Sequence, residues 1–540
     1  MITSTILQND YTSLSVDYQL KLPLELEKTI PADDPVRLLS AFVEGMDLSE
    51  LYGTYQRIRK NQATPEQLLK IVLYAAMNRI YSSRDIESSC RRDINFMYLL
   101  EGMPAPDHST IARFLSIHLS RCSKKLMAQV TAALKGLGEI TGEAVFIDGT
   151  KIESCANKYT FVWKKAVTKN MQKMFGKIIG LVCECESDYG IRAVHQDRVT
   201  PHTLIRLREE LARIRNEEGI LFVHGIGHRK PKLQKQAEKL DEFIRRLEDY
   251  QHKLEVCGDR NSYSKTDPDA TFMRMKEDAM RNGQLKPAYN VQHAVDSGYI
   301  VWTAAYPRPT DTLTLIPLIK EMEEELPFRY HDIVADAGYE SEENYLFLRE
   351  NGQDAYIKPN NYEISKKRKY RKDPGRMENM TYLEDEDAYL CKDGRKLVPQ
   401  GVRKRKTASE YQREVTIYSG NCNGCPYKTQ CIHGNNCRTP MEQRNKTLYV
   451  SKKMKQERAE CLKRITSEYG TMLRMNRSIQ AEGSFASVKA DMNFRRYLYR
   501  GKANVVAESI ILAIAHNIRT LHHRIQSGRT GHHLYELKGA

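Results

Sequence analysis

The sequence lacks the features expected of a membrane-spanning or secreted protein. Among its 540 residues there is no run of about 18 apolar residues, which argues against a transmembrane helix. Residues 1–14 do not combine a basic stretch with a following apolar core, so no secretory signal is predicted. Without such a signal, the 12 cysteines are not expected to form a disulfide framework. We therefore expect a cytoplasmic protein that has no membrane partner.

An excess of acidic residues is also missing. Lys and Arg number 84 against 69 Asp and Glu, which gives a net charge of +15 at pH 7. This balance favours a polyanionic partner. Basic residues are concentrated in three places, at 366–372, 403–406 and 495–502. One such run alone is commonly a solvated loop, but three of them in a basic chain favour contacts with phosphate groups.

The first part of the chain, over 31–135, is predicted to be helical. Thr64 followed by a proline is typical of a helix start, and a second helix is expected to begin at 82–83. A third is expected to begin at Asp107 and carries Arg113. A helix, a turn and a capped basic helix favour a DNA-binding helix-turn-helix, in which Arg113 reaches a groove. A small helical bundle that does not bind DNA is the alternative.

The rest of the chain alternates between strands and helices. In order, we expect a strand at 144–148, strands at 288–296 and 299–306, a helix at 312–325, a strand at 331–336, a helix at 342–351, a strand at 355–359, and helices at 452–490 and 503–525. This order predicts a mixed α/β core. Two segments interrupt it: a pair of long helices over 202–256, expected to form an antiparallel hairpin, and a basic, turn-rich segment over 360–450.

Three acidic residues are the strongest candidates for chemistry. Asp148 and Asp336 each end an apolar strand, and Glu482 lies on a predicted helix with Lys489 on the same face. Carboxylates placed in this way can hold a pair of Mg²⁺ ions, which stabilise the attacking and leaving oxygens of a phosphodiester. Taken singly, each residue has a simpler explanation: an Asp that forms a turn, or an exposed Glu and Lys.

The segment around Asp148 is also similar to the Asp-x-Asp-Gly-Thr motif of haloacid-dehalogenase phosphatases. The nucleophilic Asp of that motif falls on Phe146 here, so the nucleophile of that chemistry is missing.

Taken together, the segments resemble the DDE transposases of bacterial insertion sequences over nearly the whole chain. The similar segments are the helical N-terminal part (about 17–117), FIDGTKIES, TDPDATFM followed by AYNVQHAVD, DIVADAGYESEENY, and RSIQAEGSFASVKADMNFRRYLYRGKANV. Their order and spacing match those of the family. By residue, the first Asp of the family falls on Asp148, the second on Asp336 and the Glu on Glu482.

The resemblance implies an RNase H-like catalytic core and two divalent ions, Mg²⁺ or Mn²⁺, held by Asp148, Asp336 and Glu482, with Asp148 bridging both. It implies an enzyme of the bacterial cytoplasm, associated with the nucleoid, that binds the terminal inverted repeats of its element as a synaptic homodimer. The enzyme would cleave double-stranded DNA there and join the 3′-hydroxyl ends to target DNA. An inactive transposase-derived DNA-binding protein and a metal-dependent nuclease without strand transfer are the alternatives. The residues assigned to DNA contact are Arg113, Lys366, Lys367, Arg368, Lys369, Lys489, Arg495 and Arg496.

One departure from the family concerns the helix that carries Glu482. Many relatives have Tyr-x₂-Arg-x₃-Glu-x₆-Lys, but here the Tyr and Arg positions are Met475 and Ser478. The neighbouring Arg477 lies five residues before Glu482, roughly 140° around an ideal helix. We therefore do not assign Arg477 the role of that arginine in gripping the transposon end.

Four cysteines crowd into sixteen residues near the end of the second inserted segment. They are Cys422, Cys425, Cys431 and Cys437, with His433 among them. Cys-x₂-Cys is half of a tetrahedral Zn²⁺ site, so a structural zinc is predicted, in which His433 or Cys391 can replace one of the four. Reduced, unligated thiols are the alternative.

The predicted organisation has six parts, whereas length alone predicts three or four domains. They are a helical DNA-binding domain (1–135), the first part of the catalytic core (140–200), the helical-hairpin insertion (201–260), the continued core (261–360), the Cys-containing insertion (361–450) and the C-terminal core helices (451–540). Four other polar residues near the predicted core are placed outside the metal site: Asp269, His293, Asp296 as part of a hairpin turn, and Asp311 as a helix cap.

Overall fold

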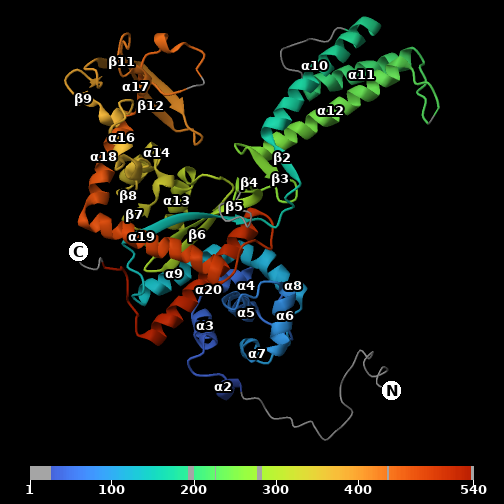
Figure 1. Cartoon of the computed structure of the whole chain (residues 1–540). Coiled ribbons are helices and arrows are strands. Elements are labelled where there is room, and N and C mark those ends of the chain that lie inside the picture. Colours follow the sequence, from blue (N-terminus) through green and yellow to red (C-terminus); the bar gives the residue numbers. More distant parts are fainter. Residues whose placement is uncertain (1–25, 192–199, 226, 276–282, 435–436, 537–540) are drawn as a thin grey trace, which may run out of the picture.

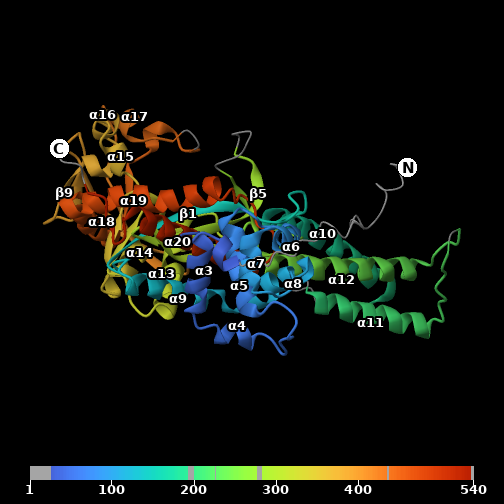
Figure 2. The ribbon, with the colours of Figure 1, turned by 90° about the horizontal axis from the view of Figure 1, so that it is seen from below.

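The computed structural model describes residues 26–191, 200–225, 227–275, 283–434 and 437–536. A central mixed sheet carries helices on its faces, and two inserted units project from opposite ends of this body (Figures 1 and 2). The predicted mixed α/β class is confirmed, as is the helical N-terminal region.

The central sheet contains β1 (Ala144–Glu153), β4 (Thr271–Arg274), β5 (Leu285–Asp296), β6 (Tyr299–Tyr306), β7 (Asp332–Ala335) and β8 (Asp354–Ile357). Its main order is β6–β5–β1–β7–β8, and β4 pairs with the first residues of β5. The pairs β6–β5 and β5–β1 are antiparallel, whereas β1–β7 and β7–β8 are parallel. Ser297 and Gly298 both have positive φ, which is the backbone that the predicted two-residue hairpin turn needs.

The parallel half of the sheet is built by helical crossovers. A 3₁₀ turn (Asp311–Leu313) and α13 (Leu315–Glu325) connect β6 to β7, and α14 (Glu342–Glu350) connects β7 to β8. Ser341 accepts a hydrogen bond from the backbone N–H of Asn344, so it caps α14. Strands β5 to β8 are buried almost throughout, which explains their near-continuous apolar sequences.

The N-terminal helices are α3 (Pro35–Glu44), α4 (Ser49–Gly53), α5 (Pro65–Met77), α6 (Ser83–Arg92), α7 (Ile94–Leu100), α8 (His108–Arg113) and α9 (Ser120–Gly136), after the short α2 (Leu26–Thr29); a π-helical turn (Phe114–Leu119) joins α8 to α9. Thr64 caps the start of α5, as its sequence predicts, and it also forms a capping box with Gln67. Helix α7 lies between the second and third predicted helices and was not anticipated.

The N-terminal helices share one hydrophobic core with the sheet. The closing helix α20 (Lys502–Ser527) packs on β6 from one side and on α5 and α9 from the other. Asn517 of α20 pairs its side-chain amide with the backbone N–H and C=O of Ile300, at 2.9 and 2.7 Å. Thr131 of α9 donates to the carbonyl of Val301 at 2.7 Å. These buried bonds fix the helical region to the sheet.

The first inserted unit is an arm of three helices. They are α10 (Lys164–Tyr189), α11 (Pro201–Glu217) and α12 (Lys232–Cys257), and they bury a core of their own. The prediction of a two-helix hairpin missed α10, so the arm begins well before residue 201. Its base is tied to the body by a short ribbon of β2 (Phe161–Trp163) and β3 (Ser262–Ser264).

The second inserted unit contains a five-stranded sheet that the sequence did not predict. Its order is β13 (Thr447–Val450), β12 (Gln412–Ser419), β11 (Lys396–Lys406), β10 (Ala388–Leu390) and β9 (Thr381–Leu383). Three short helices, α15 (Tyr362–Ser365), α16 (Arg368–Arg371) and α17 (Lys428–Cys431), flank it. Helices α18 (Lys452–Thr466) and α19 (Glu468–Ala486) then return the chain to the central sheet. A π-helical turn (Ser487–Asp491) follows α19.

Burial raises the pKa of Glu508 on α20 to about 8, although the backbone N–H groups of Leu498 and Tyr499 donate to its carboxylate and oppose this shift. The folded state therefore binds more protons than the unfolded state between pH 4.5 and about 8, so stability falls as pH rises through that window. We expect Glu508→Gln to remove this slope and to raise the free energy of unfolding at pH 8 by on the order of 1 kcal/mol. Urea denaturation of both proteins at pH 5 and pH 8 measures this, and an unchanged slope in the variant would contradict it.

Candidate active site

Asp148 and Asp336 lie on neighbouring strands at the same level of the sheet. Ile147 of β1 pairs in parallel with Ala335 of β7, and each acid is the next residue along its strand. Strand β1 continues past Asp148, whereas β7 ends at Ala335, and Asp336 starts a 3₁₀ turn by accepting the N–H of Gly338 at 2.7 Å. Asp148 is therefore not explained by a simple turn, whereas Asp336 does cap the turn that follows it.

Glu482 reaches the same place from α19, which packs across β1, β5, β7 and β8. Arg477, on the same helix, links the carboxylates: its guanidinium lies 2.9 Å from Glu482 and 3.9 Å from Asp148. The Asp148 side chain is 19% exposed and that of Glu482 is 54% exposed. The structure thus brings Asp148, Asp336 and Glu482 together, with one arginine between two of them.

The surroundings of Asp148 resist the loss of its proton. Burial raises the pKa of Asp148 to about 6; Arg477 and the Gly149 N–H oppose the shift, and the nearby carboxylates Asp336 and Glu482 add to it. Two carboxylates gathered around a third, half-buried one are costly unless cations compensate them. Arg477 supplies one positive charge, and the oxygen donors that remain are those that Mg²⁺ or Mn²⁺ prefers.

Contacts on either side of Glu482 hold α19 in register with the sheet. His293 pairs with Asp148 across β1 and β5; its ring stacks on Phe485 at 3.9 Å and bonds Ser484 at 3.1 Å. Burial lowers the pKa of His293 to about 3, so it is neutral at physiological pH. His293 is thus a buried, hydrogen-bonded residue of the core.

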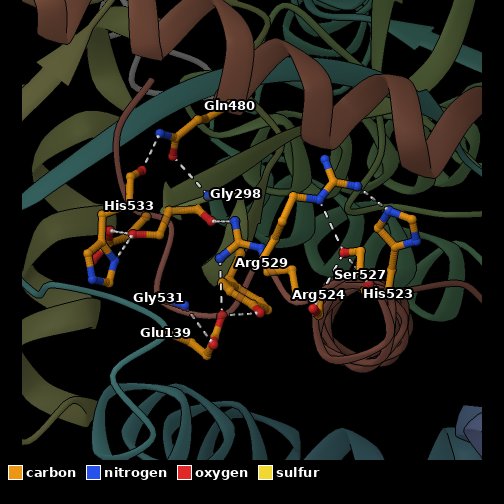
Figure 3. A network of polar contacts seen from close by, with 12 residues as sticks. Glu139, Gly298, Gln480, His523, Arg524, Ser527, Arg529, Gly531 and His533 are labelled. Atoms are coloured by element: carbon orange, nitrogen blue, oxygen red, sulfur yellow. Dashed lines mark hydrogen bonds and ion pairs between the residues drawn. The ribbon is translucent and has the colours of Figure 1, made fainter. Parts of the chain in front are cut away.

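A polar network fastens the other side of α19 (Figure 3). Gln480, two residues before Glu482, accepts the N–H of Gly298 at 2.9 Å and donates to the carbonyl of His533 at 3.1 Å. Arg524 of α20 bonds Glu139 at 3.1 Å and also the carbonyl of Ser297. The β5–β6 turn, the end of α20 and the segment after it therefore converge on the helix that carries Glu482.

Sequence reasoning missed a layer of amides beside the two aspartates. Asp311, predicted as a helix cap, instead accepts hydrogen bonds from Asn290 at 2.7 Å and from Gln292 at 3.2 Å. The hydroxyl of Tyr339 donates to Gln292 in turn. Asn290 and Gln292 alternate on a buried strand, and two amides on one face of such a strand were the available signal that polar partners lie there.

Gly149 lies very close to this layer. A Cβ atom at Gly149 would lie 2.3 Å from Nε2 of Gln292 and 2.8 Å from Oδ1 of Asp311. Asp311 also lies close to the turn after Asp336, since a Cβ at Gly338 would lie 3.2 Å from its Oδ2. Asp311 is thus a fourth carboxylate next to the three predicted ones.

A cavity of about 340 Å³ opens beside the acids, lined by Gly149, Thr150, Asp311, Gly338, Lys489 and Arg495 among others. Lys489 lies in the π-helical turn after α19 and donates to the Thr150 hydroxyl at 2.6 Å. Arg495 is exposed at the cavity wall. Arg496 instead donates to the carbonyls of Ser154 and Ala156, at 3.2 and 3.3 Å.

The other residues predicted to contact DNA lie at the surface. Arg113 is exposed at the end of α8, and Lys366, Lys367, Arg368 and Lys369 are exposed around α15 and α16 of the second insertion. Of the predicted zinc ligands, Cys422, Cys425 and Cys431 line one cavity, together with Cys391; Cys437 is exposed elsewhere, and His433 lies 3.3 Å from Asp373.

Two segments of the chain, one in the N-terminal region and one in the C-terminal part, match known sequence families. The family described as "Transposase domain (DUF772)" matches residues 24–116, and the family described as "Transposase DDE domain" matches residues 390–522, which include Glu482. The chain is a DDE transposase. As such it is a metal-dependent enzyme that hydrolyses phosphodiesters, and it acts on DNA.

The transposase has no match among curated proteins or solved structures. None of the helices in the described part of the transposase combines the length and hydrophobicity needed for a membrane span. The DDE match does not extend to Asp148 or Asp336, so their assignment depends on the geometry given above.

Proposed function

We propose that this transposase binds the ends of its own insertion sequence, cleaves the DNA there and joins the released 3′-hydroxyl ends to target DNA. The observation that carries the proposal is the convergence of Asp148, Asp336 and Glu482, which come from two adjacent strands and a crossing helix. The basic cavity beside them, with Lys489 and Arg495 in its wall, suits a phosphodiester backbone.

The sheet supports an RNase H-like core as part of this proposal. Three antiparallel strands followed by two parallel ones, in the order β6–β5–β1–β7–β8, place the first acid on the central strand. The second acid follows the neighbouring strand, and the third comes from a helix that crosses the sheet. An RNase H-like core is what the resemblance to DDE transposases implies.

Asp148, Asp336 and Glu482 are proposed to hold two Mg²⁺ or Mn²⁺ ions. Among the described residues, these carboxylates do not form a set whose oxygens all lie within 4.8 Å of one another. Mg²⁺ keeps several of its waters and needs few protein ligands, so this spacing is compatible with the site. When bound, the ions supply charge neutralisation for the attacking and leaving oxygens.

The protein's own residues orient the reaction. Arg477 holds Asp148 and Glu482 at a fixed separation, and Asn290, Gln292 and Tyr339 fix Asp311 against the turn that follows Asp336. Lys489 is placed to neutralise phosphate next to Thr150. In the proposal these groups position the DNA and balance its charge, and none forms a covalent bond with it. A synaptic dimer belongs to the same proposal, by analogy with the family.

Labelled DNA carrying the two ends that flank the gene tests the proposal. Purified transposase with Mg²⁺ is expected to expose 3′-hydroxyls at the ends and to join them to a supercoiled target. Cleavage without joining would indicate a metal-dependent nuclease. Specific binding without metal-dependent cleavage would indicate a transposase-derived DNA-binding protein, and either result would overturn the proposed activity.

The exposed basic run of the second insertion is proposed to bind the DNA backbone. Replacing Lys366, Lys367, Arg368 and Lys369 with Ala is expected to weaken binding to all sequences alike. A plot of the logarithm of the DNA-binding constant against the logarithm of the salt concentration should become shallower. Its slope should change by about 0.9 for each phosphate that the variant no longer neutralises. A control is Lys124→Ala with Lys125→Ala, two lysines that already pair with Glu321 and Glu325 on α13. An unchanged slope in the fourfold variant would assign the run to a solvated loop.

A further inference from the structure

Four cysteines of the second insertion surround one small cavity. It is lined by Cys391, Cys422, Cys425 and Cys431. Its volume is about 20 Å³, enough for one water molecule or one metal ion. They come from three separate pieces of chain: Cys391 follows β10, Cys422 and Cys425 follow β12, and Cys431 ends α17. A cluster assembled from three pieces is not a by-product of local sequence.

Two tight turns present these thiols. Cys391 opens the turn into β11, in which its N–H donates to the carbonyl of Arg395 at 2.9 Å and Gly394 has a positive φ. Cys422 and Cys425 flank a second turn, in which Gly424 has a positive φ. The Arg395 guanidinium donates to the carbonyls of Asn421 and Asn423, so it locks the two turns together.

Burial raises the pKa of the Cys425 and Cys431 thiols, and cationic groups around the cluster oppose this shift. The N–H of Lys446 donates to the sulfur of Cys422 at 3.2 Å, and the Lys446 ammonium bonds the carbonyl of Cys431 at 3.1 Å. The backbone packs tightly here, since a Cβ at Gly375 would lie 2.4 Å from the Cys431 carbonyl oxygen. Hydrogen bonds donated to sulfur and nearby positive charge both stabilise the ionised form that binds metal.

The insertion also has little else to hold it together. Its hydrophobic core consists of Met380, Tyr389, Leu397, Tyr418, Cys431, Leu448 and Val450. Small units with so few buried side chains commonly depend on a metal or on disulfides for stability. Cys431 belongs both to this core and to the cysteine cluster, so a ligand bound there would stabilise the sheet directly.

We propose that Cys391, Cys422, Cys425 and Cys431 form a tetrahedral, structural Zn²⁺ site that stabilises the basic insertion. Cys391 takes the place predicted for Cys437, because the β10–β11 turn folds onto the cluster while Cys437 remains exposed. Among the described residues, no three of the four sulfurs lie within 4.8 Å of one another. Zn–S bonds of about 2.3 Å therefore require the thiol side chains to rotate into the cavity on binding.

The test measures zinc in the full-length protein and needs no DNA. Because the acidic site can also take up zinc, each protein carries Asp336→Asn, which also keeps the outcome separate from that of transposition. After reduction and dialysis against excess Zn²⁺ and then buffer, the Asp336→Asn protein should retain one zinc per chain. Adding Cys391→Ser or Cys425→Ser should reduce this to near zero, whereas adding Cys437→Ser should leave it unchanged.

A titration covers the case in which a serine variant does not fold. The Asp336→Asn protein, stripped with a chelator, is titrated with Co²⁺, and four thiolate ligands should give strong sulfur-to-metal charge-transfer absorption that added Zn²⁺ abolishes. Zinc retention by Cys391→Ser together with its loss from Cys437→Ser would overturn the ligand set. Absence of both retained zinc and the cobalt spectrum would overturn the site.

Discussion

Glu482→Gln is expected to lower the rate of DNA-end cleavage by roughly a thousandfold, with little change in DNA affinity. The substitution keeps the size of the side chain and the packing of α19, but it removes the negative charge that lies 2.9 Å from Arg477 beside Asp148. Asp148→Asn and Asp336→Asn should have effects of similar size, since all three carboxylates are proposed to hold the same ions. Cleavage rates under single-turnover conditions and gel-shift affinities measure the two quantities separately.

The matched control is Glu468→Gln, which changes an exposed glutamate in the first turn of the same helix. It should cleave at the wild-type rate. A Glu482→Gln protein that cleaves within a few-fold of wild type would remove Glu482 from the site. If DNA binding were lost to the same extent as cleavage, Glu482 would contribute to folding or to DNA recognition and not to the metal site.

Gly149→Ala is expected to reduce the rate of DNA cleavage by about tenfold to a hundredfold, although it replaces none of the three acids. The new methyl group would lie 2.3 Å from Gln292 and 2.8 Å from Asp311, so both side chains must move. Their displacement disturbs the neighbouring Asp148 and the turn after Asp336. Single-turnover cleavage and thermal denaturation should be measured together, because a loss of rate in a folded protein is the informative result.

Gly483→Ala provides the comparison for this prediction. Gly483 is adjacent to Glu482, yet a Cβ there meets no atom within 4 Å, and alanine favours a helix over glycine. This variant should cleave normally and be slightly more stable. Equal activity of Gly149→Ala and wild type would show that the amide layer around Asp311 has no influence on the acids.

Much of the sheet was predictable from the sequence because its signals are local. The apolar runs of β5 and β6 around Ser297 and Gly298, the start of α14 and the position of Asp336 after β7 were found where they were expected. Asp148, predicted to end its strand, lies within β1 instead. Glu482 and Lys489 were expected on one face of an ideal helix. Lys489 instead lies in a π-helical turn and still reaches Thr150.

Features set by tertiary packing were not predictable in the same way. Helix α10 contains Gly176 and Gly180, which weaken its intrinsic helix propensity, and packing against α12 stabilises it. The angle of Arg477 on an ideal helix pointed away from the site, but its long side chain contacts both Asp148 and Glu482. Cys391 was separated from the other cysteines by a hairpin whose strands the sequence did not reveal.

Mn²⁺ binding to the protein without DNA tests the acidic site most directly. The electron paramagnetic resonance signal of free Mn²⁺ reports how much of the ion is bound. A competing candidate exists: His331, Asp332 and Asp354 are the set in the described chain whose potential ligand atoms all lie within 4.8 Å. If the site is that of Asp148, Asp336 and Glu482, Asp148→Asn should weaken Mn²⁺ binding by at least about tenfold, whereas Asp354→Asn should leave it unchanged. Unchanged binding in Asp148→Asn together with loss in Asp354→Asn would contradict the account.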